Sequence, residues 1–283
     1  HDALLMLGAD NGTVTLWRDS SVVEYGANGA GQVDKASNKV QESTSIASCF
    51  FALPDVADTT RGSGLVMSWQ QSSGTLVVGG NSNTLRLWDL GREQCVRVFS
   101  TGFDTCTTAL ASRAVSAEAH GGGSGGHKNL SWTFAGFADG SIAVFDERAP
   151  GTGCVSSARE HSAWVVSAHF RPDVPEIITG SVRGTVKFWD LRTMRSVKTL
   201  EVHKSPLTAL AVHPCVPILA TGSHAQFIKI LTLGGEQLGG IIKYHDGFLG
   251  QRIGPVSCLA FHPTKLMLAT GATDSIVSVY QAT

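Results

Sequence analysis

A glycine stands nine positions before an aromatic or large apolar residue six times in this sequence. The six pairs are Gly8 and Trp17, Gly79 and Trp88, Gly136 and Phe145, Gly180 and Trp189, Gly222 and Leu231, and Gly271 and Tyr280. In every copy the sixth and eighth positions after the glycine are apolar, and the position between them is mostly polar. This alternation has the period of a β-strand. Each copy therefore predicts a strand, a tight turn and a second strand.

An additional strand precedes three of these copies. The runs "WVVSAHF", "LTALAVH" and "PVSCLAFH" are short and apolar, and each leads to a proline eight residues before the glycine, at Pro172, Pro214 and Pro263. From Phe145 onward the copies end 44, 42 and 49 residues apart, at positions 145, 189, 231 and 280. This spacing is close to the roughly 40 to 45 residues of a four-stranded propeller blade. No stretch keeps a helical period, so we predict an all-β propeller whose sheets pack against their neighbours around a ring.

Two copies end in a Trp-Asp pair, in "LWD" at 87–89 and "FWD" at 188–190. These endings resemble those of the WD40 family, so the predicted fold is a WD40 β-propeller with six blade motifs in this chain. The first copy lacks an innermost strand, the last lacks an outermost one, and the chain starts at His1 in mid-pattern. Because open sheet edges are a liability, we expect an upstream segment to complete a seven-bladed ring. The alternative is six blades that close imperfectly.

The whole of 1–283 is therefore expected to be one partial propeller, missing its first blade and one strand upstream, with two loop insertions. The first insertion, 26–63, is rich in small polar residues and holds one apolar patch, "IASCFFAL". The second, 112–129, contains "HGGGSGGHKN", which has the composition of a flexible linker. We expect most of both segments to be loop.

Composition excludes several classes of protein. Lys and Arg number 22 against 23 Asp and Glu, so no basic field exists to attract nucleic acid. No apolar run approaches the roughly 20 residues of a transmembrane helix, and no signal peptide is evident. The six cysteines are scattered without metal-ligand spacing, which favours reduced core residues and a cytosolic protein.

Motifs that could carry chemistry have simpler explanations. Gly121, Gly123 and Gly126 satisfy G-x-G-x-x-G, but a strand rather than a helix follows, so a nucleotide cradle is not expected. His161, Thr179 and Trp189 resemble the hydrogen-bonded tetrad of WD40 blades, with Arg183 where that tetrad has an aspartate. No copy holds all four members, so we predict that packing holds the blades. We expect no catalytic residue, no cofactor and no metal. The structural blade residues are Trp17, Trp88, Phe145, Trp189, Tyr280, His161 and Thr179.

Two segments are candidates for partner binding. Arg148 in "FDER" and Arg192 in "WDLR" resemble a motif by which some WD40 proteins dock on the adaptor of a cullin ubiquitin ligase. The alternative is an arginine that pairs with the neighbouring acid on a solvated turn.

The second segment is the connection "IIKYHDGFLGQRIG", which is long for a blade. It offers Tyr244, Phe248, Gln251 and Arg252, and exposed aromatic and arginine side chains are favoured as interface anchors. The alternative is a loop that folds over the propeller rim with Phe248 buried.

Longer phrases resemble one family in particular. "HDALLMLGADNGTVTLWRD", "TTRGSGLVMSWQQSSGTLVVGG" and "IKYHDGFLGQRIGPVSCLAFHP" are similar to consecutive pieces of the C-terminal propeller of the Raptor family, and "YHDGFLGQRIG" and "TTRGSG" are the most specific phrases. The resemblance implies a non-enzymatic scaffold subunit of target-of-rapamycin (TOR) complex 1. It implies the TOR kinase complex as partner, with small GTPases and substrates engaged through other parts of the full-length protein. It also implies a cytoplasmic protein that partners recruit to lysosomal or vacuolar membrane. A WD40 substrate receptor of a cullin-RING ligase is the alternative function.

Overall fold

The computed structural model describes residues 3–19, 44–54, 64–115, 130–149, 151–171, 174–244 and 251–281. These residues form six antiparallel sheets. The first sheet contains β1 (Ala3–Gly8), β2 (Thr13–Asp19) and β3 (Thr44–Phe51). The second contains β4 (Leu65–Gln70), β5 (Thr75–Gly80), β6 (Thr84–Asp89) and β7 (Gln94–Ser100). The third contains β8 (Thr107–Val115), β9 (Leu130–Phe137), β10 (Ser141–Asp146) and β11 (Cys154–Arg159). The fourth sheet contains β12 (Val165–Phe170), β13 (Glu176–Ser181), β14 (Thr185–Asp190) and β15 (Arg195–Glu201). The fifth contains β16 (Leu207–Val212), β17 (Ile218–Ser223) and β18 (Phe227–Thr232). The sixth contains β19 (Val256–Phe261), β20 (Met267–Ala272) and β21 (Val277–Gln281).

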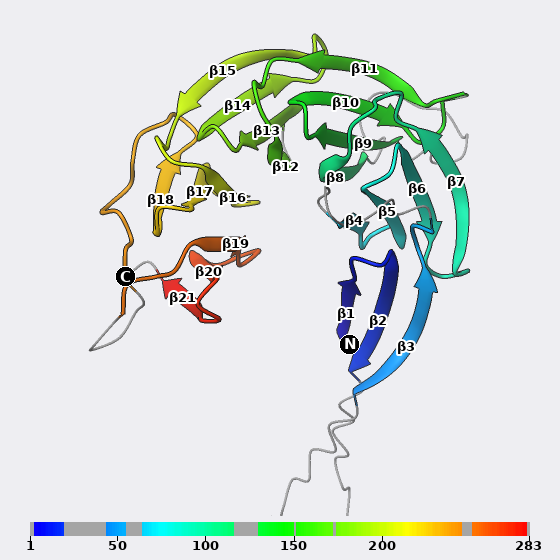
Figure 1. Ribbon diagram of the computed structural model, residues 1–283, viewed down its shortest axis with the longest axis horizontal. Coiled ribbons are helices and arrows are strands. Elements are labelled where there is room, and N and C mark those ends of the chain that lie inside the picture. Colours follow the sequence, from blue (N-terminus) through cyan, green and yellow to red (C-terminus); the bar gives the residue numbers. More distant parts are fainter. Residues whose placement is uncertain are drawn as a thin grey trace, which may run out of the picture.

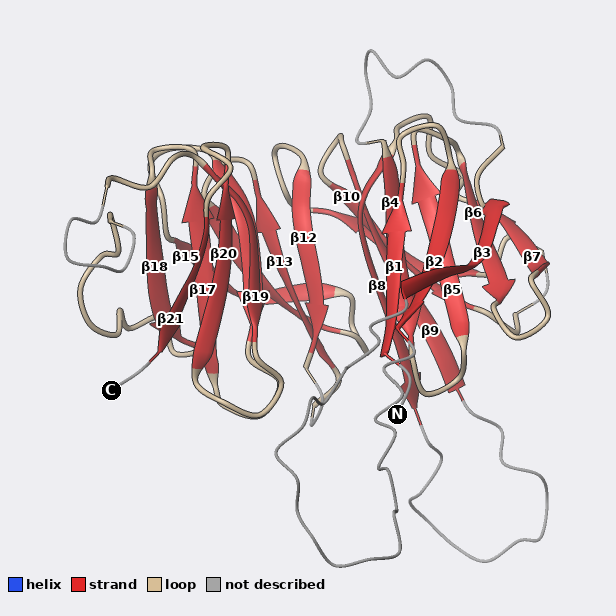
Figure 2. Ribbon diagram, turned by 90° about the horizontal axis from the view of Figure 1, so that it is seen from below, coloured by secondary structure: helices blue, strands red, loops and turns tan. Residues whose placement is uncertain are grey.

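The sheets follow one another around a common axis in chain order, and the first and last sheets face each other across a gap in the arc (Figure 1). The strands β4, β8, β12, β16 and β19 are innermost, and each contacts the next in that order. Connections gather at the two ends of the sheets, where they surround the axis (Figure 2). The predicted β-propeller is therefore confirmed.

The repeated glycines let neighbouring sheets approach closely. A Cβ built on Gly136 would lie 2.7 Å from the Cβ of Val165, which begins the inner strand of the next sheet. Gly222 stands in the same relation to Val256, at 2.8 Å. Such distances lie well inside van der Waals contact, so no larger residue fits without moving the next sheet. The glycine period in the sequence thus marks the places where blades meet.

Five apolar clusters fill the spaces between consecutive sheets, one for each junction. In the second to sixth sheets, the residue nine positions after the repeated glycine packs toward the preceding sheet. Phe145 and Trp189 are fully buried in this way, and Trp88 packs against Phe50 of the first sheet with ring centroids 4.7 Å apart. Trp17, in the first sheet, is only partly buried. The core is therefore a series of interfaces rather than one central mass.

Two cations on outer strands strengthen these junctions. Arg97 on β7 donates to the main-chain oxygens of Glu147, at 2.6 Å, and Ala149, and its guanidinium lies 4.6 Å from the centroid of Phe99. Lys198, at the matching place on β15, donates to the oxygen of Leu233 in the next sheet at 3.0 Å. Each cation thereby fastens its sheet to a turn of the following one.

The insertions differ from the prediction in their extent. Residues 44–51, inside the expected loop 26–63, form β3, the outer strand of the first sheet, with Thr13 paired to Phe51. The apolar patch is therefore part of a blade, because an outer strand needs apolar residues for its inward face. The second insertion was also placed too early. Strands β8 and β9 stay paired as far as Val115 and Leu130, which leaves 116–129 between them, outside the described residues.

Candidate functional site

His161, Thr179 and Trp189 form a buried hydrogen-bonded chain in the fourth sheet. The Trp189 indole donates to Thr179 Oγ1 at 2.7 Å, and His161 Nε2 lies 2.7 Å from the same oxygen. All three side chains are at most 3% exposed. Hydrogen bonds as well as packing therefore hold this blade together. The prediction that packing alone holds it was wrong. The chain forms without the aspartate because the threonine hydroxyl joins the two rings by itself.

The fifth sheet contains a shorter version of this chain. His203 Nε2 lies 2.9 Å from Thr221 Oγ1, and Leu231 occupies the place of the tryptophan. The Nδ1 atoms of both histidines are buried without a hydrogen-bond partner. Burial, together with a nearby lysine, lowers the pKa of His161 and of His203 to about 4. Both rings are therefore neutral at physiological pH and are enclosed in the blades, which is a structural role.

Arg148 and Arg192 are held by the acid that precedes them. Arg148 Nε lies 3.3 Å from Asp146 and Arg192 Nε lies 3.2 Å from Asp190, and each arginine main-chain N–H also donates to the same carboxylate at 2.9 Å. The hydrogen bond from Arg192 holds the pKa of Asp190 below its usual value. The geometry is thus that of the local ion pair. The Arg192 side chain nevertheless remains 77% exposed.

The described part of the long connection lies beside the junction of the fifth and sixth sheets. Tyr244 and Arg252 form a β-bridge, and the Tyr244 carbonyl accepts a 3.0 Å hydrogen bond from the hydroxyl of Tyr280 on β21. Tyr244, Gln251 and Arg252 are exposed, whereas Ile253, two residues on from Gln251, is buried against the sixth sheet. Phe248 lies outside the described residues. The structure therefore brings three of the candidate residues to one place on the rim, away from Arg148 and Arg192.

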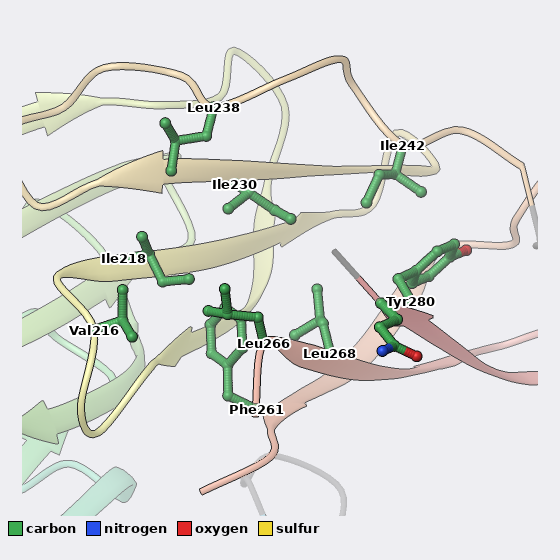
Figure 3. A pocket seen from close by; sticks show the side chains of 10 residues that line it. Val216, Ile218, Ile230, Leu238, Ile242, Phe261, Leu266, Leu268 and Tyr280 are labelled. Carbon is green, nitrogen blue, oxygen red and sulfur yellow. The ribbon is translucent and has the colours of Figure 1, made fainter. Parts of the chain in front are cut away.

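A pocket opens at this same junction (Figure 3). Its volume is about 530 Å³, and every lining residue except Gln281 is apolar or aromatic. The lining residues come from β17 to β21 and from the segments beside them: Val216, Ile218, Ile230, Leu238, Ile242, Phe261, Leu266, Leu268, Tyr280 and Gln281. We call it the rim pocket.

The rim pocket exists because the fifth sheet has no regular fourth strand among the described residues. Where β7, β11 and β15 cover their sheets, the chain after β18 makes only isolated bridges, between Leu231 and Gln237 and between Ile228 and Ile242. This site was not predicted from the sequence. The available signal was "LGGEQLGG" at 233–240, since four glycines in one segment oppose a continuous strand.

Comparisons with known proteins agree with this architecture. The family model "WD domain, G-beta repeat" matches residues 152–190, 194–230 and 248–281. The chain aligns over 99% of its length, at 37% identity, with "Regulatory-associated protein of TOR 1" of Arabidopsis thaliana, and covers 19% of that protein. It aligns over 98% of its length, at 33% identity, with "Protein raptor homolog" of Dictyostelium discoideum, and covers 17% of it. With "Target of rapamycin complex 1 subunit mip1" of Schizosaccharomyces pombe it is 32% identical over 99% of its length, and covers 19% of that subunit.

Solved structures show the same fold. The crystal structure of Chaetomium thermophilum Raptor matches all of this chain with a TM-score of 0.76 at 24% identity, and 23% of that chain is covered. The described residues include no helix long and apolar enough to cross a bilayer. The chain spans about a fifth of the length of the curated relatives it matches. Because the similarity, at 32 to 37% identity, extends over 98 to 99% of this chain, the chain is a WD40 domain of the Raptor family.

Proposed function

We propose that this chain is the docking propeller of a non-catalytic scaffold subunit of TOR complex 1. The observation that carries the proposal is the similarity over nearly the whole chain to proteins named as TOR-regulatory or TOR complex 1 subunits. A ring of packed sheets is suited to this role, because it holds loops and rims rigidly for protein contacts.

The absence of catalysis is part of the proposal. Its support is that His161 and His203, whose pKa falls to about 4, are enclosed in their blades beside threonines, and that His169, whose pKa burial also lowers, has its Nε2 2.8 Å from the Leu210 carbonyl. Perturbed groups of an enzyme would face a cleft that admits substrate. The chain's own contribution is then binding alone.

The wider setting is proposed from the family. The full-length protein associates with the TOR kinase, and it meets small GTPases and substrates through parts outside this chain. It resides in the cytoplasm, from which partners recruit it to lysosomal or vacuolar membrane. Tyr244, Phe248, Gln251 and Arg252 are the proposed contact residues of the propeller, and Arg148 and Arg192 are secondary candidates.

A seventh blade is proposed to close the ring. Support comes from apolar side chains on the two sheets that border the gap, Leu5 and Leu7 on β1 and Val277 and Val279 on β21, which are 50 to 73% exposed. Exposed apolar strands of this kind are normally covered.

The direct test is affinity purification of the full-length protein from its own cells, probed for the TOR kinase and for a cullin adaptor. Recovery of the kinase, unchanged by Arg192→Ala, supports the scaffold. Recovery of the adaptor without the kinase, abolished by Arg192→Ala, would instead establish a ligase receptor.

A further inference from the structure

The rim pocket is a slot between two rows of apolar side chains. One row comes from the fifth sheet and the segment that follows it, and the other comes from the sixth sheet (Figure 3). The slot opens to solvent, since the lining residues Leu238 and Leu266 are 41% and 45% exposed. An open apolar hollow of this kind is typical of a binding site. The first row includes Ile218, Ile230 and Ile242, and the second includes Leu266, Leu268 and Tyr280 (Figure 3).

The volume of the slot is that of a binding site. Pockets that bind ligands commonly measure about 300 to 1,000 Å³, and an apolar cavity of roughly 150 Å³ stays free of water and binds benzene. The 530 Å³ of the rim pocket therefore takes a ligand considerably larger than benzene. Ordered water needs polar partners, which this wall barely supplies. Hydrocarbon therefore displaces water from the slot readily.

Few polar groups face the slot. Among the described residues no charged side chain lines it, and only Tyr280 and Gln281 have polar side-chain atoms. The Tyr280 hydroxyl donates to the Tyr244 carbonyl at 3.0 Å, so it already has a partner within the chain. A charged or hydrogen-bonding group would lose its water in the slot without gaining a partner there, which costs free energy. The buried part of a ligand must therefore be hydrocarbon.

The edge of β18 beside the slot offers little main chain to a peptide. The Ile230 carbonyl accepts a hydrogen bond from the Leu238 N–H at 2.8 Å, and Ile228 and Ile242 exchange two main-chain hydrogen bonds, at 2.9 and 3.0 Å. An extended peptide laid into the slot would find these groups already paired, so its own N–H and C=O groups would stay without partners. A hydrocarbon chain has no such groups. The slot therefore suits a hydrocarbon chain better than a peptide.

We propose that the rim pocket binds the hydrocarbon tail of a free fatty acid. The tail lies in the slot between β18 and β20, and the carboxylate stays in solvent at the mouth, because the wall offers it no cation. Removal of the tail from water supplies the affinity, which should rise roughly fourfold with each methylene group that enters the slot. This inference goes beyond the proposed scaffold function, since it adds a small-molecule site to a chain proposed to contact proteins.

The test is calorimetric titration of the full-length protein with octanoate, decanoate, dodecanoate and tetradecanoate, each below its micelle concentration. Phosphatidylcholine vesicles are measured in parallel. We expect one fatty acid per chain, with an affinity that rises roughly fourfold per methylene and levels off once the slot is full. Absence of binding would mean that another part of the full-length protein fills the slot, and would overturn the proposal. Binding of many molecules per chain, or binding to vesicles alone, would overturn it as well.

Variants then place the site. Leu238→Asp puts a charge at the mouth and should weaken dodecanoate at least about tenfold. Leu266→Trp narrows the slot, so the affinity should level off at a shorter chain. Val197→Asp and Val197→Trp are the matched controls, because Val197 is a 67% exposed apolar residue on β15 of another sheet, and they should leave binding unchanged. All three positions are exposed, so the fold is kept, and equal urea midpoints check this. Unaltered binding in both pocket variants would overturn the proposal.

Kinase recovery in the same preparations separates this inference from the proposed function. Normal recovery of the kinase without fatty acid binding removes only the fatty acid site and leaves the scaffold function standing. Absence of the kinase from the wild-type protein, with the chain-length dependence as expected, removes the proposed function and leaves the site.

Discussion

Removal of the Thr179 hydroxyl should destabilise the fourth blade more than the same change in either of the next two. Thr179→Val keeps the shape of the side chain but leaves the Trp189 indole N–H and His161 Nε2 without their partner. A buried polar group left unsatisfied costs about 1–3 kcal/mol, so the two together cost about 2–6 kcal/mol. Thr221→Val removes the partner of His203 Nε2 together with a 3.4 Å hydrogen bond to the Lys229 carbonyl, and should cost about 1–3 kcal/mol. Thr270→Val removes only a 3.4 Å bond to the Ser278 carbonyl, and should cost less than about 1 kcal/mol.

The assay is hydrogen–deuterium exchange of the full-length protein, read by mass spectrometry on peptides from β13, β17 and β20. Local opening free energies follow from the exchange rates, and each 1.4 kcal/mol corresponds to about a tenfold faster exchange. Thr179→Val should accelerate exchange in β13 by at least about 30-fold, Thr221→Val should have a smaller effect in β17, and Thr270→Val should change β20 least. Equal acceleration in all three strands would refute the reasoning, because it would mean that hydrogen bonds to the threonine do not contribute.

Three further predictions concern pH, close approach and the cation contacts. The pKa of His161 and of His203 falls from 6.5 to about 4 on folding, so the stability that the neutral rings contribute is fully present above pH 6.5 and is lost as pH falls toward 4, by up to about 3 kcal/mol per histidine. His161→Gln should flatten the pH dependence of exchange in β13. An unchanged slope would contradict the lowered pKa of His161. Gly222→Ala should lower the free energy of unfolding in urea by about 1–3 kcal/mol, because its Cβ would collide with Val256 of the next sheet. Gly240→Ala, whose Cβ would have no atom within 4 Å, should be neutral or slightly stabilising. Similar urea midpoints for the two variants would argue against the close approach of Gly222 to Val256. Arg97→Met should lower the free energy of unfolding by about 2–4 kcal/mol and loosen the turn after β10. Arg92→Met is the control, because it removes only an exposed 3.6 Å ion pair with Asp89, and it should cost under about 1 kcal/mol in the same urea titration.

The sequence predicted the parts of the fold that repeat. Gly180 and Trp189 mark two paired strands because a blade needs a small residue where the next sheet approaches and a large one where it faces the preceding sheet. These requirements are local and recur at every junction, so they appear in the sequence as a repeating pattern. The predicted order of strands within each blade follows from the same pattern.

Features that occur once were harder to predict. The strand Thr44–Phe51 pairs with β2 across a long intervening segment. The sequence therefore lacks the short turn that normally indicates a following outer strand. The predicted contact residues Tyr244 and Arg252 lie beside the rim pocket, but the pocket itself depends on how Ile230 and Leu268 of neighbouring sheets are spaced. Such spacing comes from tertiary packing, which no single stretch of sequence specifies.

The central claim is that this chain acts by docking in a TOR complex. Its most direct test is the phosphorylation rate of a protein substrate by kinase complexes assembled with the full-length protein or with the same protein lacking residues 1–283. If the propeller docks in the complex, its removal lowers the rate on the protein substrate, or causes loss of the kinase from the assembly, with an unchanged kcat on a short peptide that the kinase accepts without a scaffold. Equal kinase recovery and equal rates on the protein substrate would contradict it.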